Sequence, residues 1–195
     1  MIKIGLTGSM GMGKSTTAEI FKNLGIDVYD ADKTVEEIYQ GEAVVALKPY
    51  FPNVIEDNKI SKAKLRTHLQ NHPKDFEQLE AIIHPILQQK QQDWLKQQGD
   101  KNAKMVVFDI PLLYENALET TVDAVIVVDV PLELRIHRVQ ERSGLSEDDI
   151  RVRDAAQLEL TEKVKRADYV IDNSKGLDEL KQQVDEVWSK LIDLV

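Results

Sequence analysis

The stretch Gly8–Ser15, GSMGMGKS, lies between an apolar run and a helical pattern. It matches G-x-x-x-x-G-K-[ST], which forms a phosphate site where it joins a strand to a helix. The glycines let the backbone curl around phosphate oxygens with its N–H groups pointing inward, and the following helix directs its positive dipole end at the same oxygens. We therefore predict that Gly8, Gly11, Met12 and Gly13 cradle nucleotide phosphates.

Three side chains at the end of this loop supply the chemistry. Lys14 provides a mobile cation for the terminal phosphates, the Ser15 hydroxyl suits Mg²⁺, and Thr16 can contact another phosphate. The alternative is a glycine-rich turn that merely connects two elements. Because the whole motif matches in the expected context, we favour the phosphate loop.

Asp109 is a candidate partner for the same Mg²⁺. It ends the apolar run Met105–Asp109, and a strand that ends in Asp near a phosphate loop commonly supplies such a carboxylate. The alternative is an ordinary turn residue at a strand end.

The apolar runs indicate an α/β fold. Their β-branched, nearly continuous hydrophobicity is typical of parallel strands that are covered on both faces, and helical patterns separate them. We predict a five-stranded parallel sheet flanked by helices, as in P-loop NTPases. The expected strands are Ile2–Thr7, Met105–Asp109 and Ala124–Asp129, with the shorter runs Ile26–Tyr29 and Tyr169–Asp172.

The stretch Asp32–Gly99 shows no strand pattern, and we interpret it as a helical insertion. After the strand that ends at Asp129, a basic helix is expected from Pro131 to about Ser143, followed by a helix start at Ser146. The other expected helices cover Ser15–Leu24, Thr34–Tyr39, Ser61–Gln70, Pro73–Gln98 and Gly176–Leu194.

Composition excludes several classes of site. The chain has 195 residues and no cysteine, so disulfides, thiolate zinc sites and cysteine nucleophiles are excluded. A net charge of -9 argues against general nucleic-acid binding. The sequence also has neither a signal-peptide pattern nor an apolar span of about 20 residues, so we expect a cytoplasmic protein that is not inserted in a membrane.

Positive charge is gathered locally, since five of the seven arginines lie within nineteen residues, 135–153. Arg138 and Arg142 are one helical turn apart, so both can point from one helix face toward a phosphate. The alternative is surface salt bridging with Glu141 or Asp148.

Further short sequence motifs indicate which class of nucleotide-binding protein this is. No guanine-reading N-K-x-D follows the strand that ends at Asp129, so a GTPase is not indicated. The other blocks are D-A-D at 30–32, H-P at 84–85, D-I-P-L-L-Y-E at 109–115, the arginine pair, R-x-x-x-Q at 153–157 and D-N-S at 172–174. In this order, over nearly the whole chain, they resemble the dephospho-coenzyme A kinase family.

The resemblance implies transfer of the ATP γ-phosphate to the ribose 3′-hydroxyl of dephospho-CoA, with Mg²⁺. It also implies a nucleotide-binding core (1–31, 100–134 and 167–195), a helical dephospho-CoA-binding region (32–99) and a lid (135–166). We expect small-molecule substrates, and a monomer or small homo-oligomer.

The resemblance also implies roles for single residues. Asp32 would sit near the acceptor hydroxyl as base or orienter, whereas Asp30 is at least as well explained as a helix N-cap. Asn173 would lie near the adenine, although a turn residue is the alternative. The dephospho-CoA pocket would include His84, Leu113 and Glu115, with a structural histidine and a packing leucine as alternatives.

The sequence departs from the family pattern in the loop and in the lid. The family loop reads nearer G-G-I-G-S-G-K-S, whereas Ser9, Met10 and Met12 stand here. Arg135 replaces a frequent Gln, and Asp154 replaces an aliphatic residue. We expect these changes to affect loop shape or nucleotide preference and the details of the lid.

Two rival functions remain at this point. One is a kinase of the same architecture that acts on another small alcohol. The other is a regulatory protein that hydrolyses ATP slowly. Asp32 together with the paired arginines favours phosphate transfer over a switch.

Overall fold

The computed structural model describes residues 1–192 of the chain. It divides into two compact units, one made of Met1–Tyr29 with the chain from Lys101 onward, and the other of Asp30–Asp100. Each unit has its own apolar core.

The first unit is built on the predicted five-stranded sheet, with strand order β2-β5-β1-β6-β7. The central strand β1 pairs in parallel with β5 on one side and β6 on the other, and β6 pairs in parallel with β7. The fold class predicted from the apolar runs is therefore confirmed. The strands are β1 (Ile2–Thr7), β2 (Asp27–Asp30), β5 (Met105–Asp109), β6 (Ala124–Asp129) and β7 (Tyr169–Asp172).

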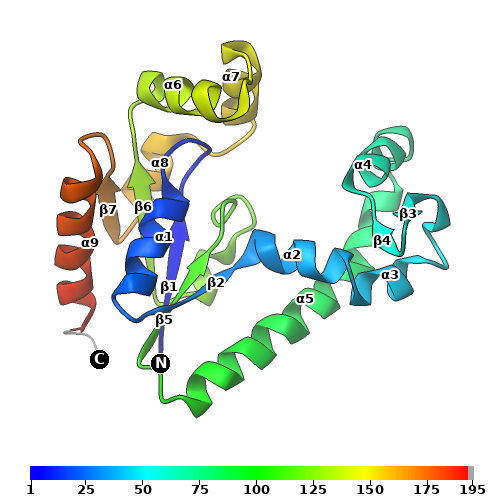
Figure 1. Ribbon diagram of the computed structural model, residues 1–195, viewed down its shortest axis with the longest axis horizontal. Coiled ribbons are helices and arrows are strands. Elements are labelled where there is room, and N and C mark those ends of the chain that lie inside the picture. Colours follow the sequence, from blue (N-terminus) through cyan, green and yellow to red (C-terminus); the bar gives the residue numbers. More distant parts are fainter. Residues whose placement is uncertain (193–195) are drawn as a thin grey trace. The chain divides into compact units, whose positions relative to one another are not determined.

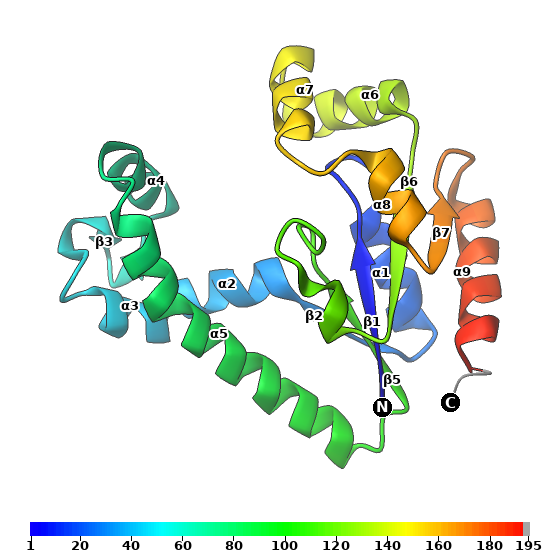
Figure 2. The same cartoon turned by 180° about the vertical axis from the view of Figure 1, so that it is seen from behind.

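Helices cover both faces of the sheet. Figures 1 and 2 show α1 (Lys14–Asn23) and α9 (Leu177–Ile192) on one face and α8 (Leu160–Arg166) on the other. Helices α6 (Leu132–Ser143) and α7 (Glu147–Ala155) lie beyond the carboxyl ends of the strands. The last helix was predicted to reach Leu194, which lies outside the described residues.

The second unit is mainly helical. A cluster of buried side chains, among them Ile38, Leu47, Phe51 and Ile83, joins its helices. Its elements are α2 (Ala31–Tyr39), α3 (Glu42–Leu47), the short η1 (Pro52–Val54), α4 (Lys62–Asn71) and α5 (Asp75–Asp100). No helix in residues 1–192 combines the length and the apolar character needed to cross a membrane.

The prediction that Asp32–Gly99 contains no strand was wrong. Strands β3 (Ile55–Glu56) and β4 (Lys59–Ile60) form an antiparallel hairpin. Its turn residues Asp57 and Asn58 have φ of 48° and 57°, which is the backbone of a tight two-residue hairpin turn. Two-residue strands are too short to give an alternating pattern. The short helices α3, α8, η1 and η2 (Leu118–Thr121) were also not predicted.

Candidate functional site: a phosphate loop with a paired lysine and aspartate

The GSMGMGKS stretch connects β1 to α1, as its motif predicts. Helix α1 begins at Lys14 after Gly13, and no side chain caps its first backbone N–H groups. Those N–H groups have no partner within the helix, so they are available to an anion. The exposed hydroxyls of Ser15 and Thr16 lie in the same first turn.

Two glycines of the loop have a steric requirement. Gly11 and Gly13 have φ of 84° and 85°, in the left-handed region. A Cβ atom on Gly13 would come within 2.0 Å of Asn173 Nδ2, and one on Gly11 would come within 2.7 Å of Val139 Cγ2. A side chain at either position would therefore force the loop away from its neighbours.

Lys14 forms an ion pair with Asp109, which ends β5. The Lys14 side chain is only 14% exposed and that of Asp109 only 7%. The parallel pairing of β1 with β5 brings the ends of the two strands together, so the predicted phosphate-binding lysine and the predicted metal partner do meet.

Asp109 and Ser15 provide oxygen donors of the kind that Mg²⁺ prefers. Within residues 1–192, no cluster of three or more acidic or histidine side chains could hold a metal by itself. Mg²⁺ commonly takes one or two protein oxygens and completes its shell with substrate phosphates and water. The donor set therefore fits a magnesium–nucleotide complex.

Asn173 lies against the phosphate loop. The residue is 7% exposed, and its Nδ2 donates a hydrogen bond to the Met12 backbone carbonyl over 2.8 Å. Its own carbonyl accepts a hydrogen bond from Arg138 over 3.0 Å. Asn173 therefore connects α6 to the loop, and a contact with adenine stays a prediction.

Arg138 and Arg142 lie on α6. Arg138 is half-buried and Arg142 is exposed. Neither forms an ion pair with Glu141 or Asp148 in the part of the chain that the structure describes, so the salt-bridge alternative is not supported.

In the second unit, Asp30 is the N-cap of α2, and its Oδ1 accepts a hydrogen bond from the Lys33 backbone N–H over 2.9 Å. This confirms the cap interpretation. Asp32, in the first turn of the same helix, is exposed. The two acids therefore differ, because the Asp30 carboxylate accepts a backbone hydrogen bond whereas Asp32 is exposed to solvent.

The three residues predicted for the dephospho-CoA pocket have different environments. His84 lies on α5, with a side chain that is 61% exposed and a ring nitrogen 3.9 Å from Glu80. Leu113 is fully buried against Gly5, where a Cβ atom would come within 2.5 Å of its Cδ1. Packing therefore accounts for Leu113.

Glu115 is held by a buried lysine that the sequence analysis did not identify. Lys163 is 0% exposed, and its Nζ lies 2.7 Å from Glu115 Oε1 and 3.3 Å from Gln157 Oε1. The same Oε1 accepts a hydrogen bond from the Leu158 backbone N–H. Nothing in the local pattern distinguishes Lys163 from a solvated lysine. Oε2 has no hydrogen-bond partner among the described residues, so a bond from the substrate stays a prediction.

Burial pushes the pKa of Glu115 up, but hydrogen bonds from Lys163 and Leu158 outweigh this and hold the pKa below the ordinary value of a glutamate. The stability from this pair is therefore complete above about pH 4.5 and is lost as pH falls through the folded-state pKa.

We expect Lys163→Met to lower the free energy of unfolding at pH 7 by about 3 kcal/mol, since it leaves a largely buried carboxylate without its cation. In the variant, burial without the cation should raise the pKa of Glu115. The variant should therefore be more stable at pH 5 than at pH 7. Thermal unfolding at both pH values checks this, with Lys165→Met, which breaks an exposed pair with Glu162, as control. A loss of stability on acidification that parallels the wild type would contradict it.

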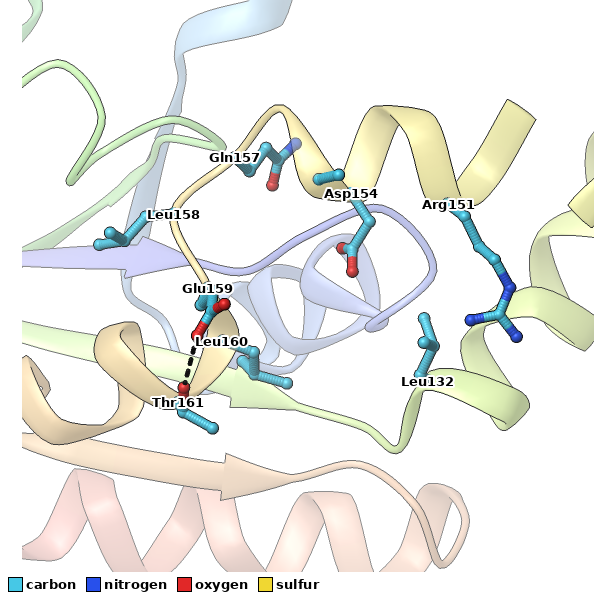
Figure 3. Close-up of a pocket in the computed structure, with 9 residues that line it drawn as sticks. Leu132, Arg151, Asp154, Gln157, Leu158, Glu159, Leu160 and Thr161 are labelled. Atoms are coloured by element: carbon cyan, nitrogen blue, oxygen red, sulfur yellow. Dashed lines mark hydrogen bonds between the residues drawn. The ribbon is translucent and has the colours of Figure 1, made fainter. Parts of the chain in front are cut away.

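A cavity of about 440 Å³ opens beside α7 and α8 in the unit that contains the phosphate loop (Figure 3). The residues that border it include Leu132, Arg151, Asp154 and Gln157. None of the predicted site residues lines it.

Comparison with known proteins agrees with the geometry. The profile of the dephospho-CoA kinase family matches residues 2–179. A protein from Nitrobacter winogradskyi named dephospho-CoA kinase is 41% identical over 187 residues, covering 96% of this chain and 94% of the relative.

Two solved structures are also similar. TT1252 from Thermus thermophilus has a TM-score of 0.86 and 32% identity, with 97% of both chains covered. A dephospho-CoA kinase from Campylobacter jejuni has a TM-score of 0.72 and 27% identity, covering 97% of this chain and 96% of that one.

Proposed function

The chain belongs to the dephospho-CoA kinase family and is an ATP-dependent kinase, and we propose that its site uses Lys14, Asp32 and the α6 arginines in distinct roles. The reaction moves the γ-phosphate of ATP to the ribose 3′-hydroxyl of dephospho-CoA and gives CoA and ADP. The observation that carries the assignment is the paired Lys14 and Asp109 at the open amino end of α1.

The phosphates of ATP occupy the loop formed by Gly8, Gly11, Met12 and Gly13. The free N–H groups of the first turn of α1 meet their oxygens, and Thr16 contacts one of them. Lys14 shifts from its pairing with Asp109 to the terminal phosphates, where it stabilises the negative charge on the transferred group.

Ser15 and Asp109 would hold Mg²⁺, which when bound neutralises phosphate charge and orients the terminal phosphate. The support for this lies in their oxygen donors and in the position of Asp109 at the end of β5.

Asp32 orients the acceptor. Its exposed carboxylate accepts the hydrogen bond of the 3′-hydroxyl and takes the proton as the oxygen bonds to phosphorus. Phosphate transfer needs mainly alignment and charge neutralisation, so even a weak base can serve as the acceptor's partner. His84 contributes a ring nitrogen to dephospho-CoA, and Glu115 offers Oε2.

Arg138 and Arg142 act from the lid. Two observations support this role: the one-turn spacing of the two arginines on α6, and the absence of an ion pair with Glu141 or Asp148 in the described residues. Both guanidinium groups neutralise charge on the phosphate during transfer. In this assignment residues 32–99 bind dephospho-CoA, residues 135–166 form the lid, and Asn173 contacts the adenine.

We also retain as proposals a cytoplasmic location and a monomer or small homo-oligomer. The cysteine-free sequence is compatible with a reducing compartment.

An acceptor panel tests the proposed function. We expect phosphorylation of dephospho-CoA, with the new monoester at the ribose 3′ position by phosphorus NMR. CoA is the matched control, because its 3′ position already carries a phosphate and should accept no other. A higher kcat/KM for a simple nucleoside or sugar alcohol would favour the rival kinase.

A further inference from the structure

Helix α6 rests directly on the phosphate loop. The loop residue Met10 packs against a small apolar cluster formed by Ile136, Val139 and Ile150, of which the first two come from α6 and the last from α7. At Gly11 the approach is close, since an added Cβ would lie 3.0 Å from the backbone oxygen of Arg135. The loop and α6 are therefore in direct contact, with no room for a side chain at Gly11.

An ion pair between a buried arginine and a partly exposed aspartate holds α7 against α6. Arg135 is 3% exposed, and its Nη1 and Nη2 donate hydrogen bonds to the two carboxylate oxygens of Asp154 over 2.6 Å and 2.9 Å. Figure 3 shows Asp154 projecting from α7 at the cavity that Leu132 of α6 also borders. Two parallel hydrogen bonds fix both the distance and the orientation of the groups they join.

This pair is a poor source of net stability. Taking the Arg135 charge out of water costs free energy that its attraction to Asp154 often only repays. The Nε atom of Arg135 is also buried with no hydrogen-bond partner in the described residues. The pair is therefore better suited to fixing the relative position of α6 and α7 than to adding stability.

We propose that Arg135 and Asp154 are positioning residues that lock α6 and α7 into one block seated on the phosphate loop. The block sets the direction from which Arg138 and Arg142 meet the transferred phosphate, because α6 and α7 keep one fixed arrangement. This inference rests on the proposed roles of those two arginines.

The conservative variant Arg135→Lys separates geometry from charge. Lysine keeps the positive charge opposite Asp154 but cannot form the two-pronged contact. We expect kcat for CoA formation to fall by about 10- to 100-fold, as for a small misplacement of reacting groups, with KM for ATP within about two-fold. ADP should exceed CoA, because a loosened lid admits water to the γ-phosphate.

A double variant tests whether the pair is only structural. Asp154→Leu alone leaves a buried guanidinium charge and should lower Tm by about 10 °C. Adding Arg135→Leu removes that charge and should restore most of the lost Tm. We expect kcat and the ADP to CoA ratio to stay impaired, and the backbone amides of α7 to exchange hydrogen faster than in the wild type.

Glu162→Gln on α8, which breaks an exposed ion pair with Lys165, is the control and should match the wild type. Wild-type kcat and wild-type α7 exchange in the double variant would overturn the proposal, and so would faster exchange with unchanged kcat. An Arg142→Ala enzyme with wild-type kcat would instead contradict the proposed role of Arg142. The hydrogen exchange of the α7 amides tests the Arg135–Asp154 lock independently of the role of Arg142, because it does not depend on catalysis.

Discussion

Replacing Lys14 with methionine is expected to lower kcat for CoA formation by about 10³-fold or more. A positive group on the transferred phosphate can contribute about 10³- to 10⁵-fold in phosphate-transfer enzymes. Methionine preserves much of the side-chain volume while removing the charge. Because the ammonium group pairs with Asp109 in the free protein, Tm should fall as well.

Lys14→Arg is the matched control for charge. It keeps a cation opposite Asp109 and should retain much of the Tm, while its wider group fits poorly against the terminal phosphates. Initial rates under saturating ATP, together with thermal unfolding, separate the two effects. A kcat for Lys14→Met within ten-fold of the wild type would remove Lys14 from its assigned role.

Asp32→Asn should lower kcat by about 10²- to 10⁴-fold, the range for a positioned general base. The amide keeps the shape of the side chain but accepts a proton far less readily. ATP binding should be unchanged, because Asp32 lies in the unit that does not contain the phosphate loop. Calorimetric titration with ATP and initial rates of CoA formation measure both quantities.

The neighbouring acid provides the comparison. Asp30→Ala removes the N-cap of α2 and should cost about 1 kcal/mol of stability, with near wild-type kcat at a temperature well below Tm. Asp30→Asn should be close to neutral, since asparagine caps helices as well as aspartate does. Equal kinetic losses in Asp30→Ala and Asp32→Asn would show that the base assignment fails.

The sequence predicted the sheet because apolar runs rich in β-branched residues form its three longer strands, β1, β5 and β6. It missed β3 and β4 because two residues carry no period, and it missed α3 and α8 because helices of 6 and 7 residues span too few turns to show a stripe. The hairpin turn was marked only by Asp57 and Asn58, which are common in loops of every kind.

The sequence predicted one contact of the site but not two others. The meeting of Lys14 with Asp109 follows from motif and strand order, since both residues lie at the carboxyl edge of neighbouring parallel strands. The Lys163 contact with Glu115 and the Arg135 contact with Asp154 join residues 48 and 19 positions apart. No local pattern connects such distant positions, although the two unusual residues at 135 and 154 were visible as departures.

A product balance tests the central claim most directly. The protein is incubated with ATP, Mg²⁺ and dephospho-CoA, and ADP and CoA are measured over time, with a parallel reaction that lacks dephospho-CoA. We predict equal amounts of ADP and CoA, and little ADP when the acceptor is omitted. ADP formed at the same rate with and without dephospho-CoA, and without any CoA, would contradict the assignment.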